Sequence, residues 1–305
     1  PQRLAKLREL GFNRLSFGVQ DFDPRVQVAV HRVQSFEDVR DLMQSARALG
    51  YASVNVDLIY GLPLQTTASF ARTIEQVSAL RPDRIALYAY AHLPERFKPQ
   101  RRINTQDLPD RATRVGLLSA AIEGFLKQGY TYIGMDHFAL TTDALAIAKQ
   151  RGQLHRNFQG YSTQPDRDLV ALGVSAIGRI GNTYSQNAKD LDSYYAAIEA
   201  GHFAVERGLA LSADDLVRRD VIMDIMCQGK VDFAGIEARH GLRFGDYFGP
   251  ELSQAANLAE LGLVNLRAGE LRVTGLGWYF VRAVAMTFDG YLRNASTAAS
   301  YSRII

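Results

Sequence analysis

Three polar side chains stand within or beside apolar runs, where they could together hold one ligand. Asp57 lies inside the run VNVDLIYGLP (54–63), and a buried carboxylate there needs either an arginine in an ion pair or a ligand with hydroxyl or cationic groups. Arg32 follows a proline-containing loop, and its planar guanidinium can bind a carboxylate through two hydrogen bonds, unless it is a solvated loop charge. Gln20, at the end of RLSFGVQ (14–20), adds an amide donor and acceptor. These residues indicate a site for a polar ligand that carries a carboxylate.

The segment LHRNFQGYSTQ (154–164) carries more hydrogen-bonding groups than a connecting loop requires. Its two basic side chains, His155 and Arg156, suit an anionic ligand, and its amides could fix their orientation. An ordered loop whose polar groups satisfy one another would explain the same composition. Both interpretations remain open from the residues alone.

Other kinds of reaction find little support in the residues. GVSAI around Ser175 resembles the turn that carries a hydrolase nucleophile, but Ile177 stands where that motif requires a second glycine. The six histidines are far apart in the sequence, and no two of them stand four residues apart as on a metal-binding helix. Cys227 lies in the apolar segment VIMDIMCQG, which is typical of buried packing.

The composition bounds the class of protein. A chain of 305 residues with 47% hydrophobic and 22% charged residues can bury a large core. No apolar run approaches the length of a membrane helix, and a single cysteine excludes an intramolecular disulfide and fits a reducing cytoplasm. The net charge of +3 is too small to indicate a nucleic-acid-binding protein.

Apolar runs alternate with amphipathic segments in the first half of the chain, which predicts right-handed β–α–β units and a parallel sheet. The run 54–63 is almost wholly apolar, as in a parallel strand that is covered on both faces. The predicted strands are 14–20, 54–63, 84–94 and 130–138, with 169–178 as a fifth strand or a buried turn. The predicted helices are one in LAKLRELGF (4–12), one from Ser35 to Gly50, one capped by Thr66 or Thr67, and one with Val115, Leu118, Ile122 and Phe125 on one face.

Four or five such units are too few to close an eight-stranded barrel, so we predict an α/β fold with an incomplete (β/α) barrel of parallel strands over residues 1–205. Polar residues collect where the strands end, Asp136 and His137 among them, and ligands bind at this edge of parallel sheets. Residues 206–305 are predicted to form a mostly helical, winged-helix-like domain with a small hairpin near Gly269. Acidic and basic residues nearly balance there, which favours packing over DNA binding.

Several longer motifs follow one another along the chain. They are GFNRLSFGVQDF (11–22), HR (31–32), VNVDLIYGLPLQT (54–66), YAHLP (90–94), IGMDHFA (133–139), LHRNFQGYSTQ (154–164) and FDGYLR (288–293). In these motifs the chain closely resembles the bacterial oxygen-independent coproporphyrinogen III oxidases, which are radical S-adenosylmethionine enzymes of haem biosynthesis. The resemblance extends from Gly11 to the C-terminus, and DHFA and HRNFQGY separate this family from the haem chaperone of the same superfamily.

The resemblance implies a partial barrel with a 4Fe–4S cluster and two bound S-adenosylmethionine molecules in the parent enzyme. The implied reaction is the oxidative decarboxylation of two propionates of coproporphyrinogen III to vinyl groups, which gives protoporphyrinogen IX without O₂. Matched position by position, Gln20, Arg32, Asp57 and Ala91 correspond to residues around one S-adenosylmethionine. Ile177 corresponds to a contact of the cluster-bound S-adenosylmethionine.

The substrate that the resemblance implies carries four carboxylates, which suits a rim that contains arginine and histidine. We expect His155 and Arg156 to face this substrate, with Asp136 and His137 contributing to the same rim. The expected protein is a cytoplasmic monomer that needs a reductant for the cluster and binds neither nucleic acid nor membranes. The alternative is a haem- or porphyrin-binding relative without decarboxylase activity.

The chain departs from the family pattern at the cluster. The family holds its cluster with a CxxxCxxC motif, which is absent here, and one cysteine cannot supply three thiolates, so no metal ligand is expected in this chain. The sequence also opens at Pro1 partway into a predicted helix. We therefore expect a fragment that corresponds to the C-terminal two thirds of the enzyme and that does not catalyse the reaction alone.

Overall fold

The computed structural model describes residues 2–294 and divides into two compact units. The first unit ends at Ile147 and the second begins at Ala148. Both contain helices and strands, and the first contains parallel strands, so the chain is an α/β protein as predicted. The predicted domain boundary between residues 205 and 206 stays a prediction.

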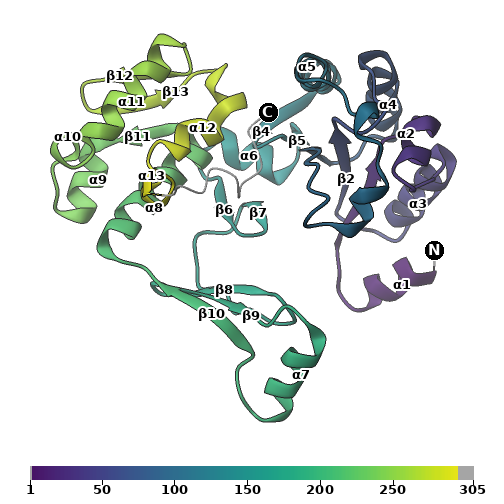
Figure 1. Cartoon of the computed structure of the whole chain (residues 1–305), viewed down its shortest axis with the longest axis horizontal. Coiled ribbons are helices and arrows are strands. Elements are labelled where there is room, and N and C mark those ends of the chain that lie inside the picture. Colours follow the sequence, from purple (N-terminus) through teal and green to yellow (C-terminus); the bar gives the residue numbers. More distant parts are fainter. Residues whose placement is uncertain (1, 295–305) are drawn as a thin grey trace. The chain divides into compact units, whose positions relative to one another are not determined.

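The first unit is built on one five-stranded sheet, in the order β1-β2-β3-β5-β4 (Figure 1). Its strands are β1 (Arg14–Gln20), β2 (Ser53–Tyr60), β3 (Arg84–Ala89), β4 (Tyr130–Gly134) and β5 (His137–Leu140). The strands β1, β2 and β3 are parallel, which confirms that part of the prediction. They are separated in sequence by helices, so each connection crosses over the sheet.

The fourth predicted strand, 130–138, is wrong as one strand. It is a hairpin in which β5 runs antiparallel to both β3 and β4. The chain reverses at Met135 and Asp136, whose φ angles are 47° and 59°, directly after Gly134. Aspartate tolerates this left-handed backbone better than most residues, but the apolar pattern of the run does not reveal the reversal.

Helices connect the strands of this unit, and the longest of them pack together on one face of the sheet. The helices are α1 (Gln2–Glu9), α2 (Pro24–Ala29), α3 (Phe36–Ala48), α4 (Thr67–Leu80), α5 (Arg111–Lys127) and α6 (Ala144–Gln150), with short 3₁₀ turns η1 (Lys98–Arg102) and η2 (Thr105–Asp107). As predicted, α3 begins after Ser35, whose side chain accepts a hydrogen bond from the Asp38 amide. Thr66 rather than Thr67 caps α4, in a capping box with Ser69.

Burial along β2 shows that its two faces differ. Val54, Val56, Leu58 and Tyr60 are fully buried beneath the helices, whereas the alternating residues Asn55, Asp57 and Ile59 are partly exposed. The prediction that β2 is covered on both faces is therefore wrong, because the second face is open. This open face carries the polar side chains of the strand.

The predicted face of α5 is partly wrong. Phe125 is buried as expected, but Leu117 and Ala121 accompany it, and Val115 is 43% exposed. The predicted and the observed sets of residues both fit a helical period. Packing of α5 against α4 and β4 buries the set that contains Leu117 and Ala121.

The second unit begins with two short β structures. A hairpin pairs β6 (His155–Asn157) with β7 (Gly160–Ser162), and an antiparallel sheet joins β8 (Ile177–Ile180), β9 (Thr183–Asn187) and β10 (Val205–Ala210), with α7 (Leu191–Glu199) between β9 and β10 (Figure 1). The predicted strand or buried turn at 169–178 is wrong. Leu169 forms an isolated bridge with Arg179, a turn lies at residues 174–175, β8 begins only at Ile177, and Leu172 is exposed.

The rest of the second unit is mostly helical around a three-stranded sheet, in the order β11-β13-β12. Its elements are α8 (Ala213–Gln228), β11 (Lys230–Asp232), α9 (Phe233–His240), α10 (Phe244–Tyr247), α11 (Gly249–Glu260), β12 (Val264–Arg267), β13 (Glu270–Val273), η3 (Gly277–Phe280), α12 (Val281–Met286) and α13 (Gly290–Asn294). The predicted hairpin near Gly269 is confirmed as β12–β13. Within residues 2–294, no helix is long and apolar enough to cross a membrane.

Candidate ligand site on the open face of the sheet

Gly18 on β1 is the point at which two of the predicted site residues meet. The guanidinium Nη2 of Arg32 donates a 2.7 Å hydrogen bond to the Gly18 carbonyl oxygen. A Cβ atom placed on Gly18 would lie 2.7 Å from Nε2 of Gln20 and 2.9 Å from Nη2 of Arg32. Both side chains therefore occupy the space that any other residue at position 18 would fill.

Asp57 lies opposite Gly18 in the register of the parallel strands β1 and β2. Ser16 Oγ donates to Asp57 Oδ2 at 2.9 Å, so Asp57 and Ser16 lie on the same face. Since side chains two residues apart on a strand share a face, the vacant side of Gly18 also belongs to this face. Gln20, Arg32 and Asp57 thus converge on the open face of the sheet, across strands about 4.8 Å apart.

Neutral donors hold the Asp57 carboxylate. Asn55 Nδ2 donates to Oδ1 at 2.6 Å, in addition to the Ser16 hydroxyl on Oδ2. In the part of the chain that the structure describes, no salt bridge reaches this carboxylate, which argues against the structural arginine pair. A carboxylate oriented by two neutral donors has further lone pairs available for a ligand.

The turn after Gln20 is anchored by a buried carboxylate, Asp21, which is 1% exposed. It accepts hydrogen bonds from the amide of Asp23, Nε2 of Gln65 and Oγ1 of Thr73 at 2.6, 2.5 and 2.8 Å. Burial raises the pKa of Asp21 although these donors favour the charged form. The network ties the end of β1 to α4, and Gln20 is held there with a φ of 67°.

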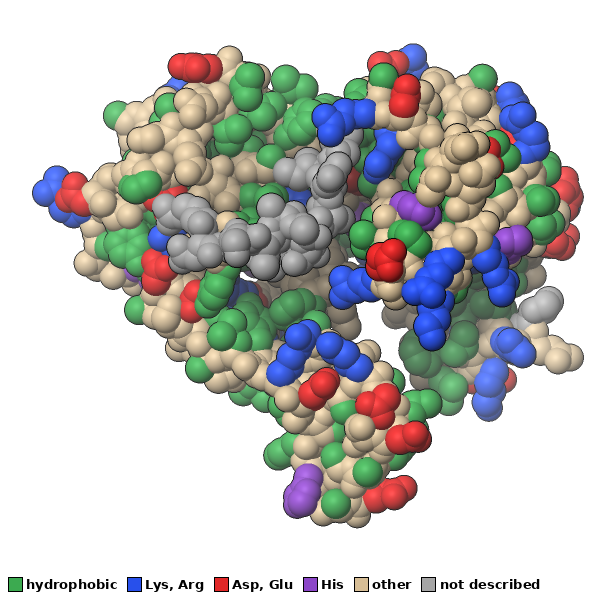
Figure 2. Space-filling view, in the orientation of Figure 1, with side chains coloured by type: hydrophobic (Ala, Val, Ile, Leu, Met, Phe, Trp, Pro, Cys, Tyr) green, Lys and Arg blue, Asp and Glu red, His purple; other side chains and the backbone are tan. Residues whose placement is uncertain are grey.

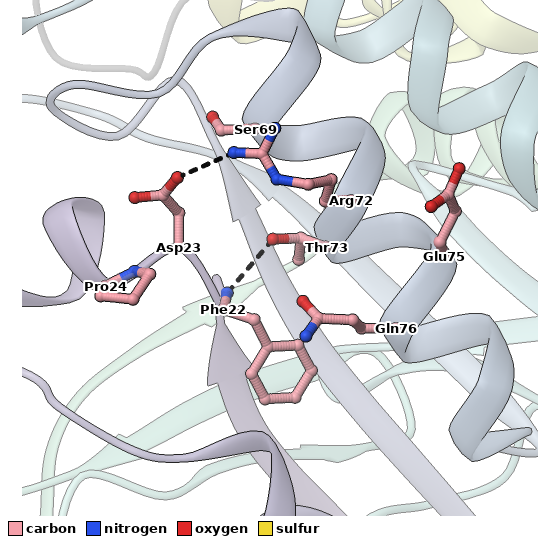
Figure 3. Close-up of a pocket in the computed structure, with 8 residues that line it drawn as sticks. All are labelled: Phe22, Asp23, Pro24, Ser69, Arg72, Thr73, Glu75 and Gln76. Atoms are coloured by element: carbon pink, nitrogen blue, oxygen red, sulfur yellow. Dashed lines mark hydrogen bonds and ion pairs between the residues drawn. The ribbon is translucent and has the colours of Figure 1, made fainter.

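A cavity of about 400 Å³ lies beside this anchor, between the residues that follow β1 and helix α4 (Figure 3). In it the Phe22 amide donates to Thr73 Oγ1 at 3.2 Å, and Arg72 pairs with Asp23 at 3.4 Å. Burial opposes ionisation of Asp23, but hydrogen bonds from Arg25 outweigh it and hold the pKa of Asp23 below its usual value. This cavity adjoins α4 and is lined by none of the predicted site residues.

His137 joins the open face through strand register. Ala86 pairs with Asp57 on one side and with His137 on the other, so the three residues form one row across the sheet. Tyr88 is 49% exposed, and its ring stands at 88° to the His137 ring with centroids 6.0 Å apart. Burial, and then the charge of Asp57, raise the pKa of Tyr88, so its hydroxyl stays a neutral donor. Asp136 instead accepts a 3.2 Å hydrogen bond from the Tyr132 hydroxyl.

Ala91 lies just beyond β3, at the edge where β2 also ends. The Tyr90 amide donates to the Tyr60 carbonyl at 2.8 Å, so the chain continues alongside the last residue of β2. Gln100 fixes the following loop because its Nε2 donates to the Ala91 carbonyl at 3.0 Å and its Oε1 accepts from the Leu93 amide at 2.5 Å.

The loop that Gln100 fixes is strongly basic. Figure 2 shows a group of Lys and Arg side chains over this connection between β3 and α5. The basic residues of the loop are Arg96, Lys98, Arg101 and Arg102, and all four are exposed or partly exposed.

The remaining predicted site residues belong to the second unit. Ile177 is the first residue of β8 and pairs with Gln186. His155 and Arg156 are adjacent on β6, so their side chains point to opposite faces of the hairpin. The Arg156 guanidinium lies 5.7 Å from the centre of the Tyr161 ring, and its buried Nε has no hydrogen-bond partner within the described side chains.

His155 contributes to a second cavity, of about 300 Å³. Arg219 pairs there with Asp166 at 2.7 Å, and Arg239 pairs with Asp224 at 3.2 Å. Burial raises the pKa of Asp224, and Arg239 opposes this shift. The carboxylates of this cavity are thus already paired with arginines.

The residues do not fit a 4Fe–4S cluster. Cys227 is buried in α8, where burial raises the pKa of its thiol to about 12 and disfavours the thiolate that iron requires. Across the described residues, no group of three or more potential ligands is placed to hold a metal ion.

Sequence reasoning missed several contributors to this site: Ser16, Gly18, Asn55, Tyr88 and the basic loop 96–102. Asn55 had a signal, because it stands two residues before Asp57 and so shares its face within an apolar strand. Gly18 and Tyr88 had none, since their roles follow from the pairing of strands that are distant in sequence.

Comparison with known proteins places this geometry in a family. Residues 1–77 match the radical SAM superfamily, and residues 211–280 match the HemN C-terminal domain. The oxygen-independent coproporphyrinogen III oxidase of Thermostichus vulcanus is 46% identical over 290 residues, which are 95% of this chain and 89% of that protein. The chain belongs to the oxygen-independent coproporphyrinogen III oxidase family. The resemblance read from the motifs is thereby confirmed.

Other members of the oxidase family are longer. The enzymes of that name from Pseudomonas aeruginosa and Escherichia coli are 49% and 47% identical over 302 residues, 99% of this chain but 65% and 66% of those proteins. The chain thus spans about 65% of the length of these relatives. A solved structure described as coproporphyrinogen III oxidase (HemN) from Escherichia coli, a radical SAM enzyme, superposes with a TM-score of 0.92 at 46% identity, over 95% of this chain and 67% of that one.

Proposed function

We propose that this chain binds S-adenosylmethionine on the open face of β1, β2 and β3 and serves the oxygen-independent conversion of coproporphyrinogen III to protoporphyrinogen IX. The observation that carries the proposal is the convergence of Gln20, Arg32 and Asp57 around Gly18. Those side chains offer an amide, a cation and an anion within one small area. S-adenosylmethionine carries a carboxylate, an ammonium, a sulfonium and two ribose hydroxyls, which these groups complement.

Each residue has a role that its surroundings support. The guanidinium of Arg32 binds the ligand carboxylate, and Asp57 accepts hydrogen bonds from hydroxyl or ammonium groups. Gln20 orients the same end of the ligand, and Ala91 offers backbone groups at the neighbouring strand end. Ile177 is assigned an apolar contact to a second S-adenosylmethionine in this proposal.

The substrate binds beside this cofactor in the proposal. Coproporphyrinogen III carries four carboxylates, and the exposed basic loop 96–102 provides the charge to attract them. His137, Asp136, His155 and Arg156 complete the substrate contacts. Gln20, Arg32, Asp57 and Ala91 would hold S-adenosylmethionine, which would supply radical chemistry for the two oxidative decarboxylations only when a reduced cluster donates an electron to it and an acceptor takes up the electrons from the substrate.

The architecture and the assembly of the protein around this site are also proposed. The open sheet of the first unit is part of an incomplete barrel, and the helical end of the second unit is winged-helix-like. The protein acts as a cytoplasmic monomer with an external reductant. The cluster does not fit the residues of this chain, so no reaction step is assigned to them through it.

Calorimetric titration of the protein with S-adenosylmethionine tests the cofactor site. We expect saturable binding that weakens about tenfold in Arg32→Ala and in Asp57→Asn, because each change removes a charged contact. Arg40→Ala is the matched control, since Arg40 is an exposed arginine of α3 that pairs only with its neighbour Asp41 in the described structure. Absence of binding, or equal effects of all three substitutions, would refute the proposal.

A haem- or porphyrin-binding protein without decarboxylase activity is the second candidate, because the basic side chains of His155 and Arg156 suit the carboxylates of any porphyrin. Fluorescence titration with coproporphyrin III and absorbance titration with haem separate the two functions. A substrate site should prefer the four-carboxylate porphyrin and lose affinity with rising salt. Tighter binding of haem, together with no binding of S-adenosylmethionine, would support the second function instead.

A further inference from the structure

Gln27 on α2 uses its whole side-chain amide to close a loop. Its Nε2 donates to the carbonyls of Asp21 at 2.9 Å and Gln34 at 2.7 Å, and its Oε1 accepts from the Gln34 amide at 3.1 Å. The residue is 5% exposed, in a short helix that otherwise buries Val26. One amide therefore joins the two ends of the segment 21–34.

The segment that Gln27 closes is the one that carries Arg32. The Arg32 amide donates to the Gln27 carbonyl at 2.9 Å, so the backbone of Arg32 is tied to the same residue. The preceding residue, His31, is held at a φ of 55°, a conformation that few residues adopt without support. From this fixed backbone the Arg32 side chain reaches the Gly18 carbonyl.

The other end of the segment that Gln27 closes, Asp21, lies next to Gln20 in the sequence. Nε2 of Gln27 binds the carbonyl of Asp21, the residue whose carboxylate is anchored by Gln65 and Thr73. Gln27 therefore links the loop of Arg32 to the residue whose buried carboxylate ties the end of β1 to α4. A ligand that binds an arginine on a mobile loop must order the backbone as well as the side chain, and the backbone part of this entropy cost is avoided when the loop is already fixed.

We infer that Gln27 is a positioning residue that holds Arg32 over Gly18 for ligand binding. Gln27 does not touch the ligand and acts through the loop that it closes. The inference rests on the proposed function insofar as the ligand is S-adenosylmethionine, but the placement of Arg32 can be measured without any ligand.

The first test follows the Arg32 side chain by NMR in protein labelled with ¹⁵N-arginine. The Nη–H signals, which include the donor to the Gly18 carbonyl, are assigned through their loss in Arg32→Lys, and their exchange with water is compared in wild type and Gln27→Met. Methionine keeps the length and the apolar packing but removes all three hydrogen bonds. We expect exchange at Arg32 to accelerate about tenfold while Arg40 is unchanged. Unchanged exchange at Arg32 would overturn the inference.

The second test is a double-mutant cycle on the Kd for S-adenosylmethionine. Gln27→Met should weaken binding about tenfold in the wild type and less than twofold in an Arg32→Ala background, because Gln27 acts through Arg32. Additive losses in the two backgrounds would mean that Gln27 supports the fold generally, and would overturn the inference.

Gln65→Met is the matched control. Gln65 is 3% exposed, and its amide binds Asp21 and the end of β2 rather than the loop of Arg32. This substitution should destabilise the protein similarly, yet add to Arg32→Ala without coupling. Equal coupling from both glutamines would show general loosening and count against a specific role of Gln27.

Two further outcomes separate the inference from the proposed function. If wild type does not bind S-adenosylmethionine, the proposed function fails while the exchange measurement still decides the placement of Arg32. If Gln27→Met does not fold, Gln27→Asn keeps the amide on a shorter side chain that cannot reach both ends of the loop. Loss of the fold in both variants would make Gln27 a structural residue and overturn the inference.

Discussion

The two units place their candidate ligand residues by different means. In the first unit, Gly18, Asp57, Ala86 and His137 form one row because four strands pair in register. In the second unit, His155 and Arg156 lie on a hairpin of three-residue strands, where Arg156 Nε is buried without a partner among the described residues. A site set by sheet register is fixed by many distant contacts, whereas a site on a short hairpin depends on a few local ones. Substitutions in the first unit should therefore change the binding of S-adenosylmethionine, and substitutions in the hairpin of the second unit should change the binding of the porphyrin.

The largest effect is expected from Gly18→Val, which would displace the side chains of Gln20 and Arg32 from the ligand site of the first unit. Its side chain would occupy the space of the Gln20 amide and the Arg32 guanidinium, both within 3 Å of the Cβ position, so we expect S-adenosylmethionine to bind about 30-fold more weakly. Gly116→Ala is the control, because the nearest atom to its Cβ position is Thr67 Oγ1 at 3.6 Å. Calorimetry should show no change for Gly116→Ala, and equal losses in both variants would contradict the role of Gly18.

Arg156→Ala tests the second unit. We expect coproporphyrin III to bind about tenfold more weakly because a cation is lost, while S-adenosylmethionine binding is unchanged. Fluorescence and calorimetric titrations of the same preparation give both values. Unchanged porphyrin affinity would mean that the polar groups of 154–164 serve one another, as the simpler interpretation of that segment holds.

The buried amine of Lys149 makes the stability of the second unit depend on pH. Burial lowers the pKa of Lys149 in the second unit to about 8, below its ordinary value of 10.5, while its ammonium lies 3.8 Å from the Trp278 ring. Because the folded pKa is the lower one, the charged amine destabilises the fold below about pH 8, and this penalty is relieved as the pH rises from 8 towards 10.5.

Lys149→Met should remove that pH dependence. After allowance for the stabilising ring contact and for partial solvent exposure, we expect a gain of about 1 kcal/mol in wild type between pH 7.5 and 9.5 relative to the variant. Urea denaturation at the two pH values measures it. A parallel change in both proteins would show that other groups are responsible.

The smallest effect is expected from Ser16→Ala. It removes one of the two donors to Asp57 while Asn55 remains, and water can replace an exposed hydroxyl. S-adenosylmethionine should bind about threefold more weakly. An effect as large as that of Gly18→Val would mean that Ser16 contacts the ligand itself.

The sequence was a good guide wherever the signal was local. Ser35 as a helix cap, Thr66 as one of two candidate caps and the hairpin at Gly269 follow from patterns within a few residues. The parallel strands of the first unit follow from the alternation of apolar and amphipathic segments. The motifs that identified the family are local as well.

What the sequence did not reveal depends on contacts between distant segments. The reversal at Met135 and Asp136 divides one apolar run into two strands, and nothing in the period of that run distinguishes the two cases. The open second face of β2 was missed because Ile59 lies there among the polar residues. Asp57 was recognised as unusual, yet its partners Ser16 and Asn55 required the register of β1 and β2.

The reversal of β5 has a consequence for how this family can vary. His137 is the first residue of β5 and is separated from β4 by two residues. The length of that turn therefore sets the position of His137 along the strand. Chain inserted after Leu140 would leave the imidazole where it is. A single residue added at Met135 would shift the strand by one position and carry the imidazole through to the helical side.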